Sequence, residues 1–584
     1  RQALTLYQDI PGTERDQATC LFNLANTLSK LDKLAEAEPC YHQALTLYRA
    51  IPGTEQKQAD CLYNLATTLF LLGKPAEAES HYHQALTLYR AIPGTEQKQA
   101  ACLNNLATTL SKLDKLAEAE SHYHQALTLY QDIPGTERDQ AACLNNLANT
   151  LRELGQLAQA ESHYRQALTL YQGIPNTEEQ RADCLHFLAN TLRELGQPAE
   201  AEPYCHQALT LYQTLPGTEH EQANCLYNTA TTMAELGKLA EAESYYHQAL
   251  TLYQGIPNTE ENQATCLYNL ATTLSMLDKL AQAEPYYRQA LTLYQGIPNT
   301  EKKQANCLHF LANTLRKLGE LAEAESHYRQ ALTLYQTLPN TEEQQANCQH
   351  FLANTLAELG QLAEAESHYR QALTLYQTLP NTEEQQANCL GNLAITLSKL
   401  DKLAQAELYY HQALTLYQDI PNTEKKQATC LLHLAATLYN LGRGVETEPL
   451  YRQAIHLCEG TSGTEQIHAT CLQHLASVIT SKGQGHLREA LELYDHARAL
   501  YEKVADSDAD QAHCLTQQAD ITTHLGHLPD AEALYHQALA LYEHINTPIK
   551  HATCLQHLAT CLAHTPNRTT DTLKTLDNAL DILT

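Results

Sequence analysis

The cysteines and histidines near the C-terminus are the side chains best suited to bind a metal ion. His551, Cys554, His557, Cys561 and His564 follow one another at intervals of 3, 3, 4 and 3 residues, which places all five along one stripe of a helix. Thiolate and imidazole groups are zinc ligands, but a single helix face offers only two or three of them to one ion, and the zinc-finger spacings are absent. We therefore expect no metal site, with His557, Cys561 and His564 as weak candidates.

The sequence contains no motif of a catalytic site. A GxxxxGK[ST] phosphate loop, a GxSxG elbow and an HExxH pair are all absent. Carboxylate pairs such as Glu77 and Glu79 recur at the same place in most repeats, a pattern typical of a solvated outer helix face rather than of a general acid and base. We predict a protein that is not an enzyme and that uses no cofactor.

The eighteen cysteines are predicted to be reduced core residues. Fourteen of them form one column, with one member in each repeat from Cys20 to Cys554. Equivalent sulfurs then lie a whole helical hairpin apart, well beyond the roughly 7 Å that separates the Cα atoms of bridged cysteines. Reduced cysteines are typical of a reducing cytosol.

Charge and hydropathy exclude several classes of partner. The 38 Lys and Arg residues against 67 Asp and Glu residues give a net charge of −29, which repels nucleic acids and anionic membranes. No apolar run approaches the roughly 18 residues needed to span a bilayer, and no signal peptide is visible. We expect a cytoplasmic protein with a protein or peptide partner, no nucleic acid and no membrane, and with self-association left open.

A repeat of 41 residues organises the chain. The alanine of a Gln-Ala-Leu motif recurs every 41 residues from Ala3 to Ala454, and the motif continues with altered spacing to Ala579. Each repeat follows a turn containing Pro, Gly or Asn, and Thr, and the segment from Thr341 to Gln344 predicts a capping box at the helix start. Apolar residues at helical spacing then predict two helices in each repeat.

The repeat resembles the tetratricopeptide repeat family. In one copy the resemblance is carried by Leu62, Leu65, Ala66, Leu69, Ala78, Tyr82 and Ala85. The period of 41 residues exceeds the roughly 34 residues of the common form, and resembles the long variant of kinesin light chains and of bacterial signalling proteins. The resemblance implies an all-α, right-handed α-solenoid (superhelix) of about fourteen helical hairpins.

Three segments are predicted from the spacing and regularity of the copies. Residues 1–10 correspond to the second helix of a truncated hairpin, which indicates a missing N-terminal region. Residues 11–445 form the regular array. Residues 446–584 are divergent repeats with a C-terminal capping helix, and a two-residue insertion falls among them.

Comparison of the copies separates two faces of the first helix. With the core cysteine as offset 0, offsets +1, +4, +5 and +8 are almost constant, whereas offsets −1, +2, +3, +6, +9 and +10 differ among repeats. In the family that the chain resembles, the first helix lines the inner groove, so the resemblance implies that the variable positions form a concave binding surface. Drift of solvent-facing positions is the alternative.

Asparagine, histidine and aromatic residues predominate at these variable positions. An amide both donates and accepts hydrogen bonds, so an asparagine ladder is suited to an extended peptide, with a second asparagine three residues on making some contacts bidentate. Aromatic rings would supply selective pockets. An asparagine bonded to a neighbouring repeat is the alternative. The predicted peptide-binding residues are Asn23, Asn26, Tyr63, Asn64, Asn105, Asn146, Asn149, His186, Phe187, Asn228, Asn269, His309, Phe310, His350, Phe351 and Asn392.

Three functions are compatible with this sequence. The leading hypothesis is a non-enzymatic scaffold that binds a protein or peptide in the concave groove. A second, from the resemblance, is the sensor arm of a larger signalling enzyme, a nucleotide-switch ATPase or a caspase-like protease, whose effector domain lies upstream of Arg1. A third is a structural spacer or a self-assembling filament, which the near-identity of the copies suggests.

Overall fold

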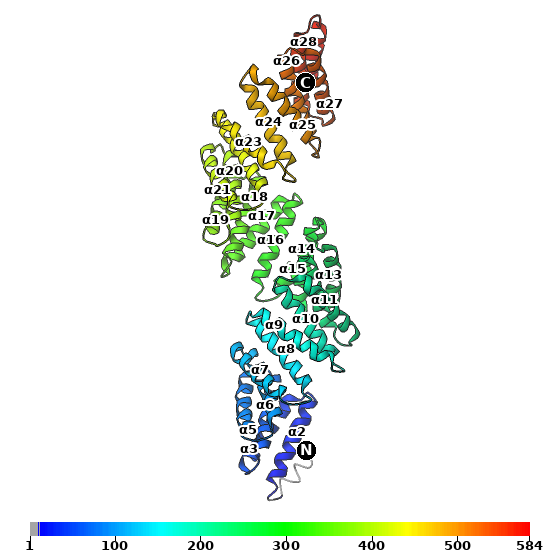
Figure 1. Ribbon diagram of the computed structural model, residues 1–584, viewed down its shortest axis with the longest axis vertical. Coiled ribbons are helices and arrows are strands. Elements are labelled where there is room, and N and C mark those ends of the chain that lie inside the picture. The colour runs from blue at the N-terminus through cyan, green and yellow to red at the C-terminus, as the bar shows by residue number, and fades with distance from the viewer. Residues whose placement is uncertain (1–9, 11, 584) are drawn as a thin grey trace. The chain divides into compact units, whose positions relative to one another are not determined.

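The chain folds into consecutive helical hairpins. The computed structural model describes residue 10 and residues 12–583, and every regular element in this part is helical. Contacts divide the chain into two units, one ending at Ile297 and the other beginning at Pro298. Figure 1 shows the helices of each unit following one another in pairs. Each unit holds seven described hairpins, so the predicted all-α solenoid of about fourteen repeats is confirmed.

In the unit that ends at Ile297, long first and second helices alternate. The first helices are α2 (Glu14–Lys30), α4 (Glu55–Leu71), α6 (Glu96–Lys112), α8 (Glu137–Glu153), α10 (Glu178–Glu194), α12 (Glu219–Glu235) and α14 (Glu260–Met276). The second helices are α3 (Leu34–Ala50), α5 (Pro75–Arg90), α7 (Leu116–Gln131), α9 (Leu157–Gln172), α11 (Pro198–Thr214), α13 (Leu239–Gln254) and α15 (Leu280–Gln295).

The unit that begins at Pro298 continues the alternation and adds two 3-10 turns. Its first helices are α16 (Glu301–Lys317), α18 (Glu342–Glu358), α20 (Glu383–Lys399), α22 (Glu424–Asn440), α24 (Glu465–Ser481), α26 (Asp508–His524) and α28 (Pro548–Ala563). Its second helices are α17 (Leu321–Thr337), α19 (Leu362–Tyr376), α21 (Leu403–Gln418), α23 (Thr447–Cys458), α25 (Leu487–Tyr501), α27 (Leu528–His544) and α29 (Thr569–Leu583). The 3-10 turns are η1 (Gly444–Glu446) and η2 (Gln484–His486).

Small and apolar side chains hold each hairpin together. In α4 the constant face is buried as predicted, and in α5 the facing alanines alternate with buried tyrosines. The alanines let the two helices approach closely, while the long tyrosine rings reach the first helix and fill the space beside them. The buried residues of this hairpin include Cys61, Leu62, Leu65, Ala66, Leu69, Ala78, Tyr82, Ala85, Leu86 and Tyr89.

The turn inside each hairpin needs a left-handed residue. Gly73 ends α4 with φ of +75°, and the backbone amide of Lys74 donates to the carbonyl of Leu69 at 2.9 Å. Glycine adopts this conformation without a Cβ penalty, which makes it the usual residue after a helix end. Asp114 takes the same place after α6 with φ of +62°, because Asp is among the few other residues that tolerate this region.

The predicted capping box is wrong. The side chain of Thr341 makes no hydrogen bond to the start of α18; its hydroxyl instead donates to the carbonyl of Tyr335, at 2.6 Å, in the preceding helix. Gln345 donates its amide to the Thr341 hydroxyl at 3.0 Å. The threonine therefore satisfies an orphan carbonyl at a helix end rather than an amide at a helix start, and it ties one hairpin to the next.

The core cysteines link neighbouring hairpins as well as filling space. The Cys102 thiol donates to the carbonyl of Tyr82 at 3.4 Å, and burial raises the pKa of this thiol to about 12. The same contact recurs from Cys61, Cys143, Cys184, Cys266, Cys348, Cys389 and Cys430. All eighteen cysteines are free in the structure.

The outer carboxylate pairs are only partly solvated. Glu77 is exposed as predicted, but Glu79 forms an ion pair of 2.7 Å with Lys115 from the following repeat, and its side chain is 18% exposed. Equivalent pairs join Lys74 to Glu38, Lys238 to Glu202, Lys279 to Glu243 and Lys402 to Glu366. One carboxylate in each of these repeats therefore bridges two hairpins.

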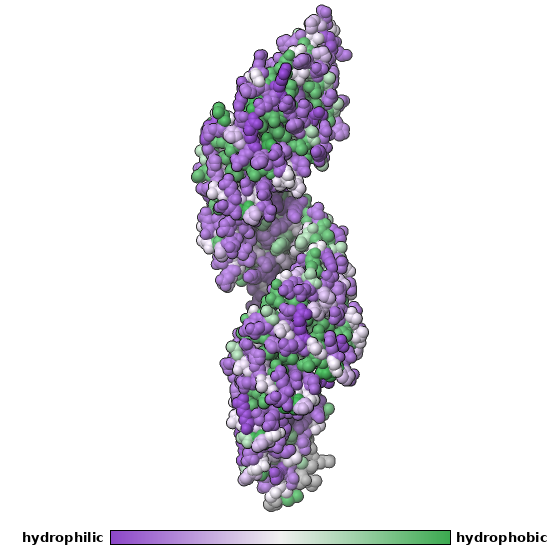
Figure 2. Space-filling view, viewed as in Figure 1, coloured by the Kyte–Doolittle hydropathy of each residue, from purple (hydrophilic) through white to green (hydrophobic). Residues whose placement is uncertain are grey.

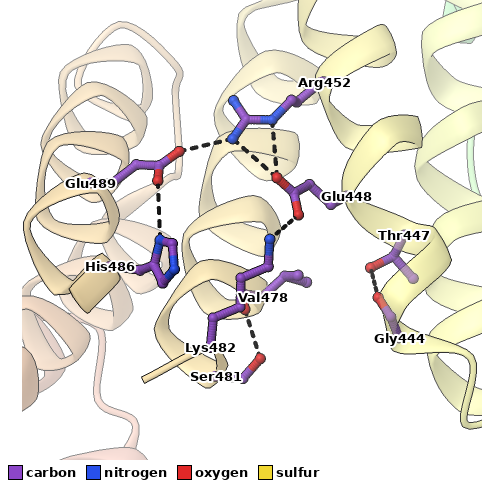
Figure 3. A network of polar contacts seen from close by, with 9 residues as sticks. All are labelled: Gly444, Thr447, Glu448, Arg452, Val478, Ser481, Lys482, His486 and Glu489. Atoms are coloured by element: carbon purple, nitrogen blue, oxygen red, sulfur yellow. Dashed lines mark hydrogen bonds and ion pairs between the residues drawn. The ribbon is translucent and has the colours of Figure 1, made fainter. Parts of the chain in front are cut away.

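The late repeats depart from this regular geometry. Helix α23 has 12 residues, shorter than every other second helix, and η1 precedes it, while η2 occupies the predicted insertion. Figure 3 shows Arg452 between Glu448 and Glu489, at 3.2 and 2.8 Å, with Lys482 at the end of α24 also contacting Glu448. This network connects α23, α24 and α25 where the regular turn is lost.

The predicted segment boundaries stay predictions. The half-hairpin expected at residues 1–10 falls almost entirely outside the described residues. The boundary expected between residues 445 and 446 lies within η1. In the last helix, α29, Leu573 and Leu576 are 60% and 43% exposed. A search of the described helices for one long and apolar enough to cross a membrane finds none.

Candidate functional site

The positions that vary among repeats form one face of the first helices, called here the variable face (offsets −1, +2, +3, +6, +9 and +10 from the core cysteine). Most of the sixteen predicted binding residues are half-buried on this face. Asn23 and Phe310 are exposed, whereas His309 and His350 are buried. On the side of each unit visible in Figure 2, hydrophobic residues form patches among hydrophilic ones.

Asparagines at offset +3 form a ladder between consecutive first helices. The Asn105 amide nitrogen donates to the Tyr63 hydroxyl at 2.8 Å. Equivalent bonds run from Asn228 to His186, from Asn269 to Tyr227 and from Asn392 to His350. These asparagines are therefore bonded to a neighbouring repeat, which was the alternative interpretation of the column. Their nitrogens are directed at the protein, and their carbonyl oxygens keep acceptor capacity for a ligand.

Asparagines at offset +6 serve as internal acceptors. Tyr41 donates its hydroxyl to Asn26 at 2.7 Å, and Tyr164 donates to Asn149 at 2.5 Å. Asn64 also donates to Asn26, at 3.0 Å. Tyrosines of the second helices thus fix the orientation of the two amides that were expected to make bidentate contacts.

The predicted histidine and phenylalanine pockets are built from mutually packed rings. His309 contacts Phe310 and Phe351 with ring centroids 5.4 and 5.6 Å apart, and His350 stacks on Phe351 at 5.7 Å. Burial lowers the pKa of His309 to about 4, and burial followed by the charge of Arg316 does the same for His350. These imidazoles are therefore neutral at neutral pH. His186 and Phe187 repeat the arrangement in the other unit, with ring centroids 5.4 Å apart.

A cavity opens on the variable face of the unit that ends at Ile297. It has a volume of about 300 Å³ and is lined by Phe22, Asp60, Tyr63, Asn64, Tyr89, Lys98 and Ala101. Lys98 and Asp60 form an ion pair of 2.6 Å in its wall, and Tyr89 donates to the same carboxylate at 2.8 Å. The charges of this wall are therefore already paired within the protein.

Two adjoining cavities open on the variable face of the other unit. The smaller, of about 350 Å³, is lined by Arg316, Asn354, Ala357, Glu358, Tyr369, Asn392, Ile395, Thr396 and Lys399. The larger, of about 500 Å³, is lined by His350, Phe351, Asn388, Gly391, Asn392, Ile395, Tyr410, Tyr417, Lys425, Lys426, Thr429, Cys430 and His433. Asn392 and Ile395 line both cavities, so the two adjoin on the face.

Two of the weak metal candidates, His557 and His564, line a fourth cavity, of about 860 Å³, near the C-terminus. His557 is 2.8 Å from the Asp520 carboxylate, which also accepts from Tyr535 at 2.6 Å, and the hydrogen bond to Asp520 raises the pKa of His557. Cys561 is buried and His564 is exposed. Within residues 12–583, no group of three or more His, Cys, Asp and Glu side chains is arranged to hold a metal ion.

Sequence reasoning missed the second-helix tyrosines and the lysines that line these cavities. Tyr410 and Tyr417 belong to columns that hardly vary, so comparison of the copies did not single them out, although a buried tyrosine hydroxyl must find a polar partner. That requirement was an available signal: Tyr417 donates to Asn388 on the variable face at 2.8 Å. Lys425 lies at offset −5, outside the positions that were compared.

Family models match most of the repeats. A family model described as tetratricopeptide repeat matches residues 16–91, 57–131, 98–173, 180–255, 230–296, 262–337, 303–378 and 344–419, and a second model of that description matches residues 427–468. A search of curated proteins found no match. Among solved structures, the crystal structure of BtubC (BKLC) from P. vanneervenii matches 38% of this chain and 91% of its own length, with 21% identity and a TM-score of 0.34.

The family matches together cover more than half of the chain. Tetratricopeptide repeats are generally modules for protein interaction, and an all-α architecture made only of such repeats is typical of non-enzymatic scaffolds. The chain belongs to the tetratricopeptide repeat family.

Proposed function

We propose that this chain is a non-enzymatic scaffold that binds an extended segment of a partner protein along the variable face. One observation carries the proposal: cavities on the variable face of both units are lined in part by residues that differ among repeats, and those of about 300 and 500 Å³ lie at corresponding offsets. A row of pockets beside a polar ladder suits an extended peptide, whose side chains project at regular intervals while its backbone remains free to hydrogen-bond.

The asparagine ladder favours a particular kind of backbone contact. Asn228 and Asn392 direct their amide nitrogens at the preceding repeat, so their carbonyl oxygens are the groups best placed for a ligand; the oxygen of Asn105 already accepts one hydrogen bond, from Asn104. Oxygen acceptors pair with the N–H groups of a peptide. We therefore expect partner N–H groups, rather than partner carbonyls, to contact this ladder.

Photo-cross-linking from two positions of one repeat pair tests the proposal. Ala101 lines the cavity of the unit that ends at Ile297, whereas Thr87 is exposed on the second helix α5. With benzoylphenylalanine at position 101, we expect one partner to be cross-linked through a contiguous peptide, and position 87 serves as the matched control. Equal yields from both positions, or cross-links from position 87 alone, would contradict binding at the variable face. An Asn105→Ala variant is less decisive, because it also removes a bond between repeats.

A further inference from the structure

The cavity of about 500 Å³ opens at a glycine in the middle of α20. Gly391 is the only glycine at offset +2, where the other repeats have Phe, Tyr, Asn, His, Leu, Gln or Thr. Its backbone is helical, and a Cβ built on it meets no atom within 4 Å. A glycine inside a helix is destabilising relative to alanine. Neither the backbone nor the local packing requires glycine here, and its effect is to leave space open.

The corresponding position of the other unit shows what fills this space elsewhere. Tyr63, at the same offset in α4, packs edge-on against Tyr82 with ring centroids 5.8 Å apart, and the cavity beside it has about 300 Å³. Gly391 supplies no ring at offset +2, and Tyr410, the counterpart of Tyr82, lines the larger cavity and is stacked on one side by His433 of the next repeat. The vacant space therefore corresponds to the place of an aromatic ring against a tyrosine.

The polar groups around this space favour an acidic ligand. Among the described residues, Lys425 makes no ion pair, and no carboxylate lines the cavity. The neighbouring Lys426 is neutralised by Glu384 at 2.5 Å. Lys399, in the wall of the adjoining cavity, is likewise without an ion pair in the described part. Lys425 is therefore an uncompensated cation beside a cavity that no carboxylate lines, and it attracts negative charge.

We propose that the Gly391 cavity receives an aromatic side chain from an extended acidic segment of the partner, with a carboxylate of that segment bound by Lys425. The inference rests on the proposed function and deepens it by naming the chemistry of the partner. The ring would pack against Tyr410 in the manner of Tyr63 against Tyr82, and a backbone N–H of the segment would donate to the Asn392 carbonyl oxygen. The Asn392 amide nitrogen is already bonded to His350 and Asn354, each at 3.1 Å.

Three tripeptides test the proposal on the full chain: acetyl-Glu-Phe-Glu-amide, acetyl-Glu-Ala-Glu-amide and acetyl-Gln-Phe-Gln-amide. Binding is measured by saturation-transfer NMR titration. We expect the first peptide to bind at least tenfold more tightly than the second and several-fold more tightly than the third. Gly391→Tyr should weaken the first peptide at least tenfold, whereas Gly391→Ala, which leaves most of the space open, should change its affinity less than threefold.

Lysine variants test the charge contact separately. Lys425→Gln should weaken acetyl-Glu-Phe-Glu-amide several-fold and leave acetyl-Gln-Phe-Gln-amide unchanged. Lys302→Gln, at the same offset in α16, is the matched control and should change neither. Circular dichroism checks the fold of each variant, and Gly391→Leu replaces Gly391→Tyr if the latter is poorly folded.

Equal binding of the phenylalanine and alanine peptides, or full binding to a folded Gly391→Tyr chain, would overturn the proposal. If no tripeptide binds while position 101 still cross-links a partner, this inference fails and the proposed function stands. If neither result is obtained, both fail.

Discussion

Acid should destabilise the repeat that contains His350, because its imidazole is held neutral. The side chain is 8% exposed, and Nε2 accepts a hydrogen bond of 3.1 Å from Asn392, an interaction that protonation of Nε2 would abolish. Burial lowers the pKa of His350 from 6.5 to about 4. Between these two pH values the imidazole is protonated in the unfolded chain and neutral in the folded chain. This contribution to stability is complete above pH 6.5 and is lost as the pH falls toward 4. At pH 5 the free energy of unfolding is therefore lower by about 2 kcal/mol than at neutral pH.

A His350→Tyr variant isolates this effect, because other repeats already use tyrosine at the same offset. Tyr63 packs against Tyr82 at 5.8 Å and 66°, almost the geometry of His350 against Tyr369 at 5.8 Å and 68°. A tyrosine hydroxyl can also accept from Asn392, as Tyr63 accepts from its own partner asparagine. The variant should therefore match the parent chain near pH 7.5 and exceed its stability by about 2 kcal/mol at pH 5.

Urea unfolding followed by far-ultraviolet circular dichroism at both pH values measures this difference. His42→Tyr is the control, since that imidazole is exposed on α3. If His350→Tyr and the parent chain lose the same stability between pH 7.5 and pH 5, the buried imidazole is not the source of acid sensitivity and the reasoning is refuted.

Four further outcomes follow from single contacts. Thr341→Val should cost about 1 kcal/mol, since it removes one of the two side-chain hydrogen bonds to the buried Tyr335 carbonyl and leaves only that of Gln345, whereas Thr341→Ser should be nearly neutral; urea midpoints of the two variants decide. Gly391→Ala should stabilise the chain by about 0.5–1 kcal/mol, measured in the same way. The half-buried Cys40 should be alkylated by iodoacetamide well before the buried Cys102, which mass spectrometry follows with time. Helices α26 and α28 should exchange amide hydrogens faster than α10 and α12, because the weakest junction of a linear stack opens first; equal protection would contradict a softer C-terminal block.

The fold was predictable because its determinants are local and repeated. The period of 41 residues, the apolar spacing and the positive-φ turn at Gly73 each act within one hairpin, and fourteen copies average out the noise of any single one. The Thr341 capping box failed for the opposite reason. Its sequence pattern is local, but the Thr341 hydroxyl donates to a carbonyl of the preceding helix. A single sequence does not show whether this carbonyl or an amide at the start of the next helix is the closer partner.

The candidate site was predictable only in part. Variation among copies identified the face, and the cavities open on that face. The direction in which each amide points depends on the neighbouring repeat, as Asn105 with Tyr63 shows, and periodicity carries no information about that partner. The cavity at Gly391 exists because glycine has no side chain. A search of the sequence for chemically active side chains does not detect such a position.

The ladder also indicates that the variable columns are coupled. Asn105, Asn228, Asn269 and Asn392, at offset +3, donate to a residue at offset +2 of the preceding repeat. Where Phe22 offers no acceptor, Asn64 donates to Asn26 instead. After Gly391 the next repeat carries His433 at offset +3, which stacks on Tyr410. These bonds link residues 38 or 42 positions apart, which independent drift of solvent-facing positions would not require. The residues proposed to contact a partner are therefore also those that join successive repeats, so exchanging a pocket residue requires a compatible partner at the neighbouring junction.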